Sequence, residues 1–242
     1  MADNSSIKHN DYTYQIVLDP IKDAWNWYDA CNDSIQHGVD WSKDVPSWVL
    51  LGIKGKSETE AYEFITKFLK QKYIDDNSQI NDFVKYINKR YSENFEIACQ
   101  LLEKAMGRPI YRKSFTIYIT TYPMAPYNYD EGSIFDYIGW SDSIVGFLHE
   151  LSHMQFTHYW RNNTDSAVSK LNDGEFEWLK ESLTVIFDEE FLPFIEIIDK
   201  GYEIHKSFRE ALHKNWKSNH NFDKLVDFGI KILPNYYEAE SK

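Results

Sequence analysis

One apolar segment with polar side chains at its centre constrains the fold of this chain more than any other feature. The segment from 142 to 160 is apolar at helical spacing and contains the run HELSH. Residues four apart lie on one helical face, so His149 and His153 can reach one metal ion, with Glu150 beside them. Burying these three groups without an ion would be costly. The pattern therefore predicts a metal site on a buried helix.

Zinc bound by two histidines needs a third protein ligand, with the fourth position left for water. A third histidine ten residues after His149 is excluded, because Tyr159 stands there. The alternative is a carboxylate on the next helix, which is expected over about 175–190. The polar stripe of that helix consists of Glu177, Glu181, Thr184 and Asp188.

The spacing between the two helices fits a shared site. Glu181 follows His153 by 28 residues (181 − 153). This length accommodates the end of the first helix, a polar loop over 162–174 and a return helix antiparallel to the first. The residues alone thus leave the choice of carboxylate within the stripe open.

These motifs carry a family resemblance. HELSH followed by WLKESLTV resembles the gluzincin branch of zinc peptidases, the thermolysin-like group, over about residues 114–190. The resemblance implies one zinc ion (Zn2+) on His149, His153 and Glu181. It also implies that Glu150 is the general base toward a zinc-activated water. Glu177 is the alternative third ligand.

The resemblance also implies groups that hold the substrate. Family members bind the peptide along a strand near the active-site helix, and the candidates here are Thr116–Thr120 and Ile134–Ile138. Some members carry a carboxylate four residues after the ligand Glu, but this position is Val185, so a zinc-bound histidine must be oriented from elsewhere. The candidates for the residue that stabilises the oxyanion are Tyr129, Tyr137, Tyr202 and His205.

Helical signals dominate the rest of the chain. Ser57 and Glu60 form a capping box, and Asp19-Pro20 is a typical helix start. Helices are expected from Asp19-Pro20, from Ser57, over about 78–106, from Ser141 or Asp142, and over about 175–190, 193–216 and 222–233; 37–56 is expected to be a loop.

Strand signals are fewer and shorter. Ser114 to Thr120 alternates apolar and polar residues, and Tyr12–Leu18 and Ile134–Ile138 are weaker candidates. The expected fold class is α+β and predominantly helical, with a small mixed sheet next to the HExxH helix and a Glu-bearing helix after it.

No repeat or low-complexity tract divides the chain, so a single zincin-like domain over 1–242 is expected. Within it we expect a helical N-terminal part over about 1–110, the sheet and the metal-binding helices over 111–190, and a helical C-terminal part over 191–242.

Composition excludes several classes of function. The formal net charge is −12 and the basic residues are interleaved with acidic ones, which argues against nucleic-acid binding. Residues 1–8 lack the apolar stretch of a secretory signal, and no apolar run is long enough for a membrane span. A cytoplasmic location is therefore expected, and the family resemblance implies a peptide or protein substrate.

Three classes of function compete. The leading hypothesis is a zinc-dependent metallopeptidase that hydrolyses peptide bonds. The alternative is a non-catalytic, zinc-stabilised binding or interaction protein with a zincin-like fold. A helical interaction module without metal is the third. Glu150 favours the enzyme, because a structural zinc site needs no base beside the open coordination position.

Overall fold

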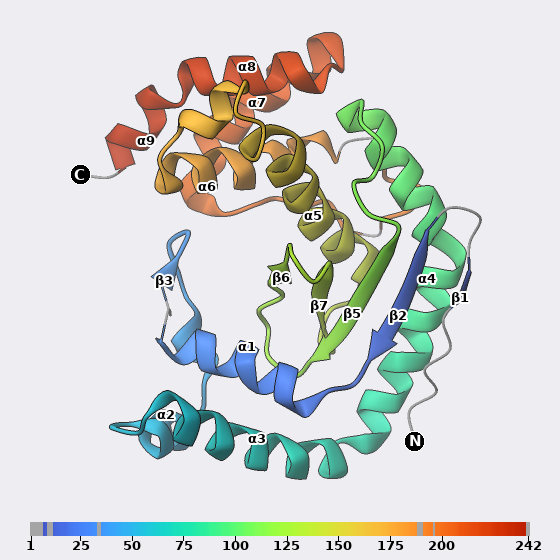
Figure 1. Ribbon diagram of the computed structural model, residues 1–242, viewed down its shortest axis with the longest axis vertical. Helices are drawn as coiled ribbons and strands as arrows, with labels where there is room; N and C mark the ends of the chain where they lie inside the picture. Colours follow the sequence, from blue (N-terminus) through green and yellow to red (C-terminus); the bar gives the residue numbers. More distant parts are fainter. Residues whose placement is uncertain (1–6, 9–11, 33–34, 188–190, 196, 241–242) are drawn as a thin grey trace. The chain divides into compact units, whose positions relative to one another are not determined.

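The computed structural model in Figure 1 describes residues 7–8, 12–32, 35–187, 191–195 and 197–240. Helices form most of this part of the chain, and a small mixed sheet accompanies them. The predicted class, α+β and predominantly helical, is confirmed. Among the described residues, no helix combines the length and apolar character needed to cross a bilayer.

Contacts within the chain define two units. Unit 1 comprises Met1–Glu93 and Lys113–Gly146, and unit 2 comprises Asn94–Arg112 and Phe147–Lys242. The division passes through two continuous helices, α4 (Asn77–Met106) and α5 (Ser143–Phe156). The expectation of one domain over 1–242, with parts divided near 110 and 190, stays a prediction.

The main sheet belongs to unit 1 and has the strand order β1-β2-β5-β7-β6. The strands β2, β5 and β7 run parallel to one another, and the two-residue strands β1 and β6 pair antiparallel at the ends. The bounds are Ile7–Lys8, Thr13–Val17, Ser114–Thr120, Tyr127–Asn128 and Ser133–Tyr137 for β1, β2, β5, β6 and β7. The predicted alternation holds in β5, where Phe115, Ile117 and Ile119 are buried.

The sheet distinguishes the two strands proposed to hold a peptide. The central strand β5 pairs with β2 on one side and β7 on the other, so its backbone groups are occupied. Along β7, β6 pairs with Ser133 and Ile134, and the Phe135 amide donates to the Pro126 carbonyl at 3.0 Å, so this side of β7 is occupied as far as Phe135. Of the two candidates, β7 is therefore the one that has a partly open edge, and a role in holding substrate stays a prediction.

Helices α1 (Pro20–Asn32) and α3 (Glu58–Asp75) pack together in unit 1, and both start where capping signals predict. The Ser57 hydroxyl and the Glu60 carboxylate form the predicted capping box of α3. The core between these helices includes Trp27, Ile65 and Leu69.

The predicted loop over 37–56 is wrong in part. It contains β4 (Val39–Asp40), a 3-10 turn (Trp41–Asp44) and the short helix α2 (Ser47–Ile53), and β3 (Ile35–Gln36) precedes it. Gly52 suggested a loop but lies inside α2, where an added Cβ would stand 2.2 Å from the ring of Phe64. Close packing, and not chain flexibility, accounts for this glycine.

Unit 2 is built from helices and short turns. The helix α5 continues into a π-helical turn (Thr157–Arg161), and α6 (Asp173–Ser182) continues into a 3-10 turn, η4 (Leu183–Ile186). A 3-10 turn (Ala167–Lys170) precedes α6, and another (Glu203–His205) precedes α7 (Lys206–Asn219), α8 (Phe222–Ile232) and α9 (Pro234–Glu240).

Two predicted helices in unit 2 need correction. The helix over 175–190 ends as an α-helix at Ser182, and 188–190, with Asp188 of the polar stripe, lie outside the described residues. The helix predicted over 193–216 begins only at Lys206. Gly201, at φ +62°, breaks the predicted helix, and the described residues between Pro193 and Lys206 form no α-helix but include the 3-10 turn Glu203–His205.

Candidate metal centre

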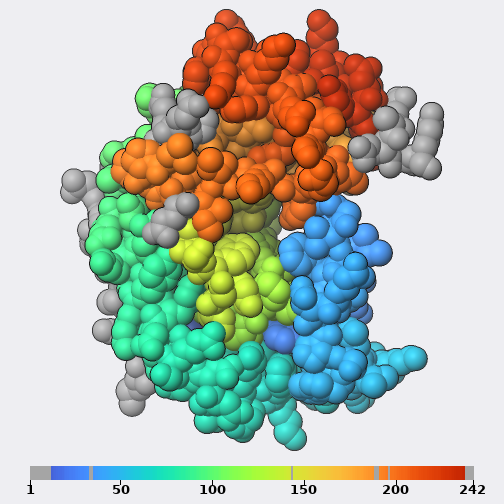
Figure 2. Space-filling model, turned by 180° about the vertical axis from the view of Figure 1, so that it is seen from behind, coloured from blue at the N-terminus to red at the C-terminus, as the bar shows by residue number. Residues whose placement is uncertain are grey.

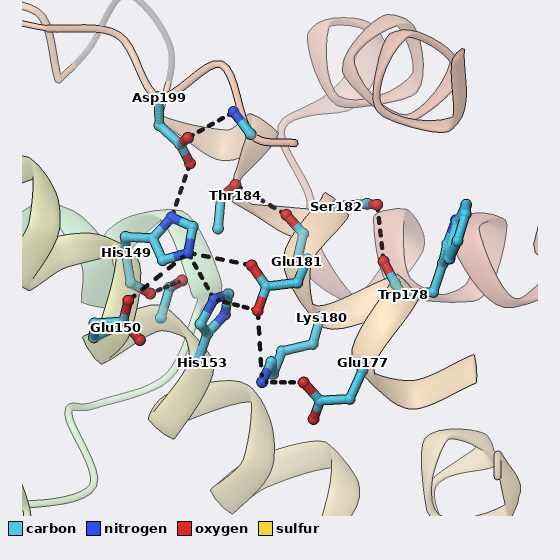
Figure 3. Close-up of polar contacts among 12 residues, drawn as sticks. His149, Glu150, His153, Glu177, Trp178, Lys180, Glu181, Ser182, Thr184 and Asp199 are labelled. Carbon is cyan, nitrogen blue, oxygen red and sulfur yellow. Dashed lines mark hydrogen bonds and ion pairs between the residues drawn. The ribbon is translucent and has the colours of Figure 1, made fainter. Parts of the chain in front are cut away.

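The first two predicted ligands lie on one face of α5. This helix is buried because Leu148 and Leu151 fill the core, and its carboxylate N-cap Asp142 accepts from the Ile144 amide at 3.1 Å. His149 and His153 turn their Nε2 atoms toward each other at 2.8 Å (Figure 3). Two imidazole nitrogens thus face one point, as the four-residue spacing predicts.

The third predicted ligand approaches the same point from α6. One Glu181 carboxylate oxygen lies 3.3 Å from His149 Nε2, and the other lies 3.1 Å from His153 Nε2 (Figure 3). All three donor atoms fall within 4.8 Å of one another. Helix α6 thus brings Glu181 to both histidines, as expected for a shared site.

The donor set fits zinc. Tetrahedral zinc with bonds of about 2.0–2.2 Å holds neighbouring ligand atoms about 3.3 Å apart. The contacts between the three side chains, 2.8 to 3.3 Å, are close to this separation. Burial lowers the pKa of His153 to about 3, which leaves the neutral imidazole that a metal requires.

Glu177, the alternative ligand, is directed elsewhere. Its carboxylate accepts from the Lys180 ammonium at 2.6 Å, and its side chain is 43% exposed. The same ammonium lies 3.6 Å from the Glu181 carboxylate and is buried. Lys180 therefore separates the two carboxylates by charge pairing, and Glu181 is the one directed at the histidines (Figure 3).

Glu150 lies beside the three donors without joining them. Its nearest carboxylate oxygen is 4.0 Å from His149 Nε2. Burial, together with the charge of Glu181, raises the pKa of Glu150 to about 8, against an opposing effect of His149. Once deprotonated, a carboxylate with a raised pKa is a stronger proton acceptor than an ordinary glutamate, which is the property a general base needs.

Asp199 is a functional candidate that the sequence did not reveal. Its carboxylate contacts Nδ1 of His149 at 3.0 Å, whereas the other ring nitrogen, Nε2, faces His153 and Glu181 (Figure 3). Burial alone would raise the pKa of Asp199, but His149 and Arg209 hold it below its usual range. Val185 has no carboxylate that could orient His149, and Asp199 makes this contact instead. Asp199 lies in an irregular segment, which the helical pattern predicted to be part of the helix over 193–216.

Arg209 connects this segment to the third ligand. Its guanidinium donates to the backbone carbonyl of Glu181 at 2.9 Å and to that of Asp199 at 3.0 Å. It also donates to the Thr184 hydroxyl, and its side chain is buried. One arginine on α7 therefore fixes the turn that ends α6 and the segment that carries Asp199.

The four candidates for the residue that stabilises the oxyanion lie in different units. Tyr129 and Tyr137 belong to unit 1, whereas Tyr202 and His205 belong to unit 2 with the ligands. His205 is buried, with its ring centroid 4.5 Å from that of Trp178. Burial raises the pKa of Tyr202, and the charges of Glu181 and Glu150 raise it further, so this phenol keeps its proton close to the site.

Comparison of the chain with protein-family models, with curated proteins and with solved structures found no match. The functional assignment therefore depends on the residues and their geometry. Of these, His149, Glu150 and His153 were identified by their motif, and the family resemblance selected Glu181 within its polar stripe, whereas Asp199 and Arg209 carry no motif. Only the missing carboxylate at position 185 indicated that such a residue had to exist.

Proposed function

We propose that this protein is a zinc-dependent metallopeptidase that resembles the gluzincins. One observation carries the proposal, namely the convergence of His149, His153 and Glu181 within 4.8 Å with Glu150 beside them. Removing carboxylates and imidazoles from water costs free energy, which a bound ion offsets. Buried clusters of this kind are typical of metal-binding and catalytic sites.

His149, His153 and Glu181 would hold the ion. When bound there, zinc supplies a Lewis acid that lowers the pKa of water and polarises the scissile carbonyl. Asp199 accepts the Nδ1 proton of His149, which fixes the tautomer that leaves Nε2 free to bind metal. Arg209 holds Asp199 and the Glu181 turn in place.

The proton moves through Glu150. Its carboxylate takes a proton from the attacking water and passes it to the leaving amine, so one side chain acts first as base and then as acid. Tyr202 donates a hydrogen bond from its phenolic hydroxyl to the oxygen that becomes negative as the carbonyl is attacked, and it keeps its proton. The substrate class is peptide or protein.

Metal content tests the ligand set. Purified wild type should carry one zinc per chain by mass spectrometry, and Glu181→Ala should lose it. Glu177→Ala is the matched control on the same helix and should retain the ion, because its carboxylate contacts Lys180 instead. A wild type that stays metal-free after zinc addition would refute the proposal.

Hydrolysis separates the enzyme from a zinc-stabilised binding protein. Wild type should cleave members of a quenched-fluorescence peptide library. Glu150→Gln should retain zinc and lose activity by a factor of about 100 to 10,000, which is the usual contribution of a general base. Full zinc occupancy with no cleavage of any peptide would favour the binding protein.

A further inference from the structure

A buried lysine, Lys180, lies beside the proposed ligand Glu181 on α6. Its side chain is 6% exposed, and its ammonium is 3.6 Å from one oxygen of the Glu181 carboxylate. Lysine is almost never buried unless its charge is paired, and a positive charge at this position repels a metal ion. Lys180 has no part in the proposed mechanism, so its position next to the ligand needs an explanation of its own.

Glu177 contacts the same ammonium from one turn earlier in the helix. Its carboxylate accepts from Lys180 at 2.6 Å. Residues four apart share one helical face, so Glu177 and Glu181 project from the same side of α6. An oxygen of Glu177 lies within 4.8 Å of an oxygen of Glu181, and Figure 3 shows the Lys180 ammonium in contact with both carboxylates. Lys180 therefore occupies the position in which a cation would join the two carboxylates.

Glu177 has the properties of a further zinc ligand once this ammonium is removed. Its side chain is 43% exposed, so it can change rotamer without disturbing the core. Two like charges four residues apart on a helix repel each other, and a shared divalent cation offsets this repulsion. With Glu177 the site would have four protein ligands, which is typical of closed structural zinc sites. A catalytic site keeps three protein ligands and leaves the fourth position to water.

We infer that Lys180 keeps Glu177 out of the coordination shell of the metal and thereby preserves the open position at which water binds. Lys180 is a positioning residue, because it acts through two carboxylates and not on the substrate. The inference deepens the proposed function and rests on it, since it concerns the fourth position of the same site. Its tests measure metal binding and therefore require no known peptide substrate.

Zinc affinity, measured on the full chain by competition with a chromogenic chelator, is the first test. Lys180→Met should lower the zinc Kd by roughly tenfold, because the ion gains a carboxylate and loses a repelling charge. Lys180→Met/Glu177→Gln removes both charged groups, so its Kd should return to that of wild type. Lys224→Met is the matched control for a lost positive charge and should bind zinc as wild type does. Lys224 is exposed on α8, in the red-orange part of the chain visible in Figure 2.

The open position is tested separately with cobalt in place of zinc, because Co2+ absorbs visible light and its spectrum changes when a ligand is exchanged. Addition of azide, an anion that replaces metal-bound water, should change the spectrum of cobalt-loaded wild type and of the double variant. The spectrum of Lys180→Met should stay unchanged, because Glu177 occupies the position. A purely structural role of Lys180 would not produce this difference.

The outcomes distinguish this inference from the proposed function. A wild type that binds no zinc would refute both, whereas in a wild type that binds one zinc the variants decide about Lys180 alone. An unchanged or higher Kd of Lys180→Met would overturn the inference, and so would the same azide response in Lys180→Met and wild type. A double variant as tight as Lys180→Met would also overturn it, because the lost positive charge alone would then set the affinity. If Lys180→Met does not fold, Lys180→Gln, which keeps a hydrogen-bond donor in the same place, must lower the Kd in its stead.

Discussion

Asp199 is not one of the proposed zinc ligands, but it contacts one of them, His149. It accepts from His149 and is held in turn by the Gly201 amide at 2.8 Å and by Arg209. Removing its charge while keeping its shape should weaken the orientation of the imidazole. We expect Asp199→Asn to raise the zinc Kd by about 10- to 100-fold, measured by competition with a chromogenic chelator.

The control for this change is Asp223→Asn. Asp223 is also paired with an arginine, Arg108, at 3.1 Å, but half of its side chain is exposed at the surface of unit 2. The zinc affinity of the Asp223→Asn variant should equal that of wild type. Equal affinities for Asp199→Asn and wild type would show that the His149 contact does not tune the metal.

A second buried carboxylate, Asp23 in α1, links stability to pH in unit 1. Its oxygens accept from the Thr120 hydroxyl at 2.7 Å, from the Thr121 amide and hydroxyl, and from Tyr73. Burial raises its pKa to about 6, although these hydrogen bonds oppose the shift. The folded state therefore binds a proton more tightly than the unfolded state, in which the pKa is 3.8.

The sign of the effect follows from this difference. Between pH 4 and 6 the folded state retains the proton that the unfolded state loses, so the contribution of Asp23 to stability falls as pH rises. The free energy of unfolding of Asp23→Asn minus that of wild type should therefore rise by up to about 3 kcal/mol from pH 4 to 7, because only wild type loses this contribution. Urea denaturation of both proteins at each pH measures this difference. A difference that stays constant with pH would contradict the prediction.

At the scale of elements, Gly229 shows how closely α8 packs in unit 2. An added Cβ would lie 2.8 Å from Leu179 of α6 and 3.3 Å from Leu212 of α7, both fully buried. Gly229→Val should therefore destabilise the fold by about 1–3 kcal/mol, the usual cost of overpacking. Asp227→Val, on the exposed face of α8, introduces the same side chain without the clash. Equal denaturation midpoints would contradict this packing.

Elements with strong local signals were predictable, and those shaped by tertiary contacts were not. The capping box at Ser57 and the alternation in β5 operate within a few residues, so the sequence predicts both. Helix α2 was missed because Gly52 indicates a loop unless the ring of Phe64 is known to lie against it. The helix predicted from 193 ignored the effect of Gly201.

The residues of the candidate site also differ in whether local sequence signals predict them. His149, Glu150 and His153 share one helix, so a four-residue period is enough to place them together. Glu181 needed the additional assumption of an antiparallel return, and the structure brings it to the two histidines. Asp199 lies 46 residues beyond His153 (199 − 153) in irregular chain, where no periodicity relates position to orientation.

At the scale of the molecule, the proposed zinc ligands all belong to unit 2, as do Asp199 and Arg209. A ligand that binds only the folded state stabilises the part of the chain that must open to release it. Zinc should therefore stabilise α5, α6 and η4 against opening more than the rest of the chain. The sheet of unit 1 has its own contacts and includes no proposed ligand.

Hydrogen exchange with and without zinc tests whether the two units open independently. With free zinc at one hundred times its Kd, amides of α6 and η4 should exchange up to about 100-fold more slowly, which corresponds to about 2.7 kcal/mol. Amides of β5 and β7 should exchange at unchanged rates. The Glu181→Ala variant is the control, because zinc should alter neither region. Equal slowing in both units of wild type would instead mean that they open together, as the single domain predicted over 1–242 requires.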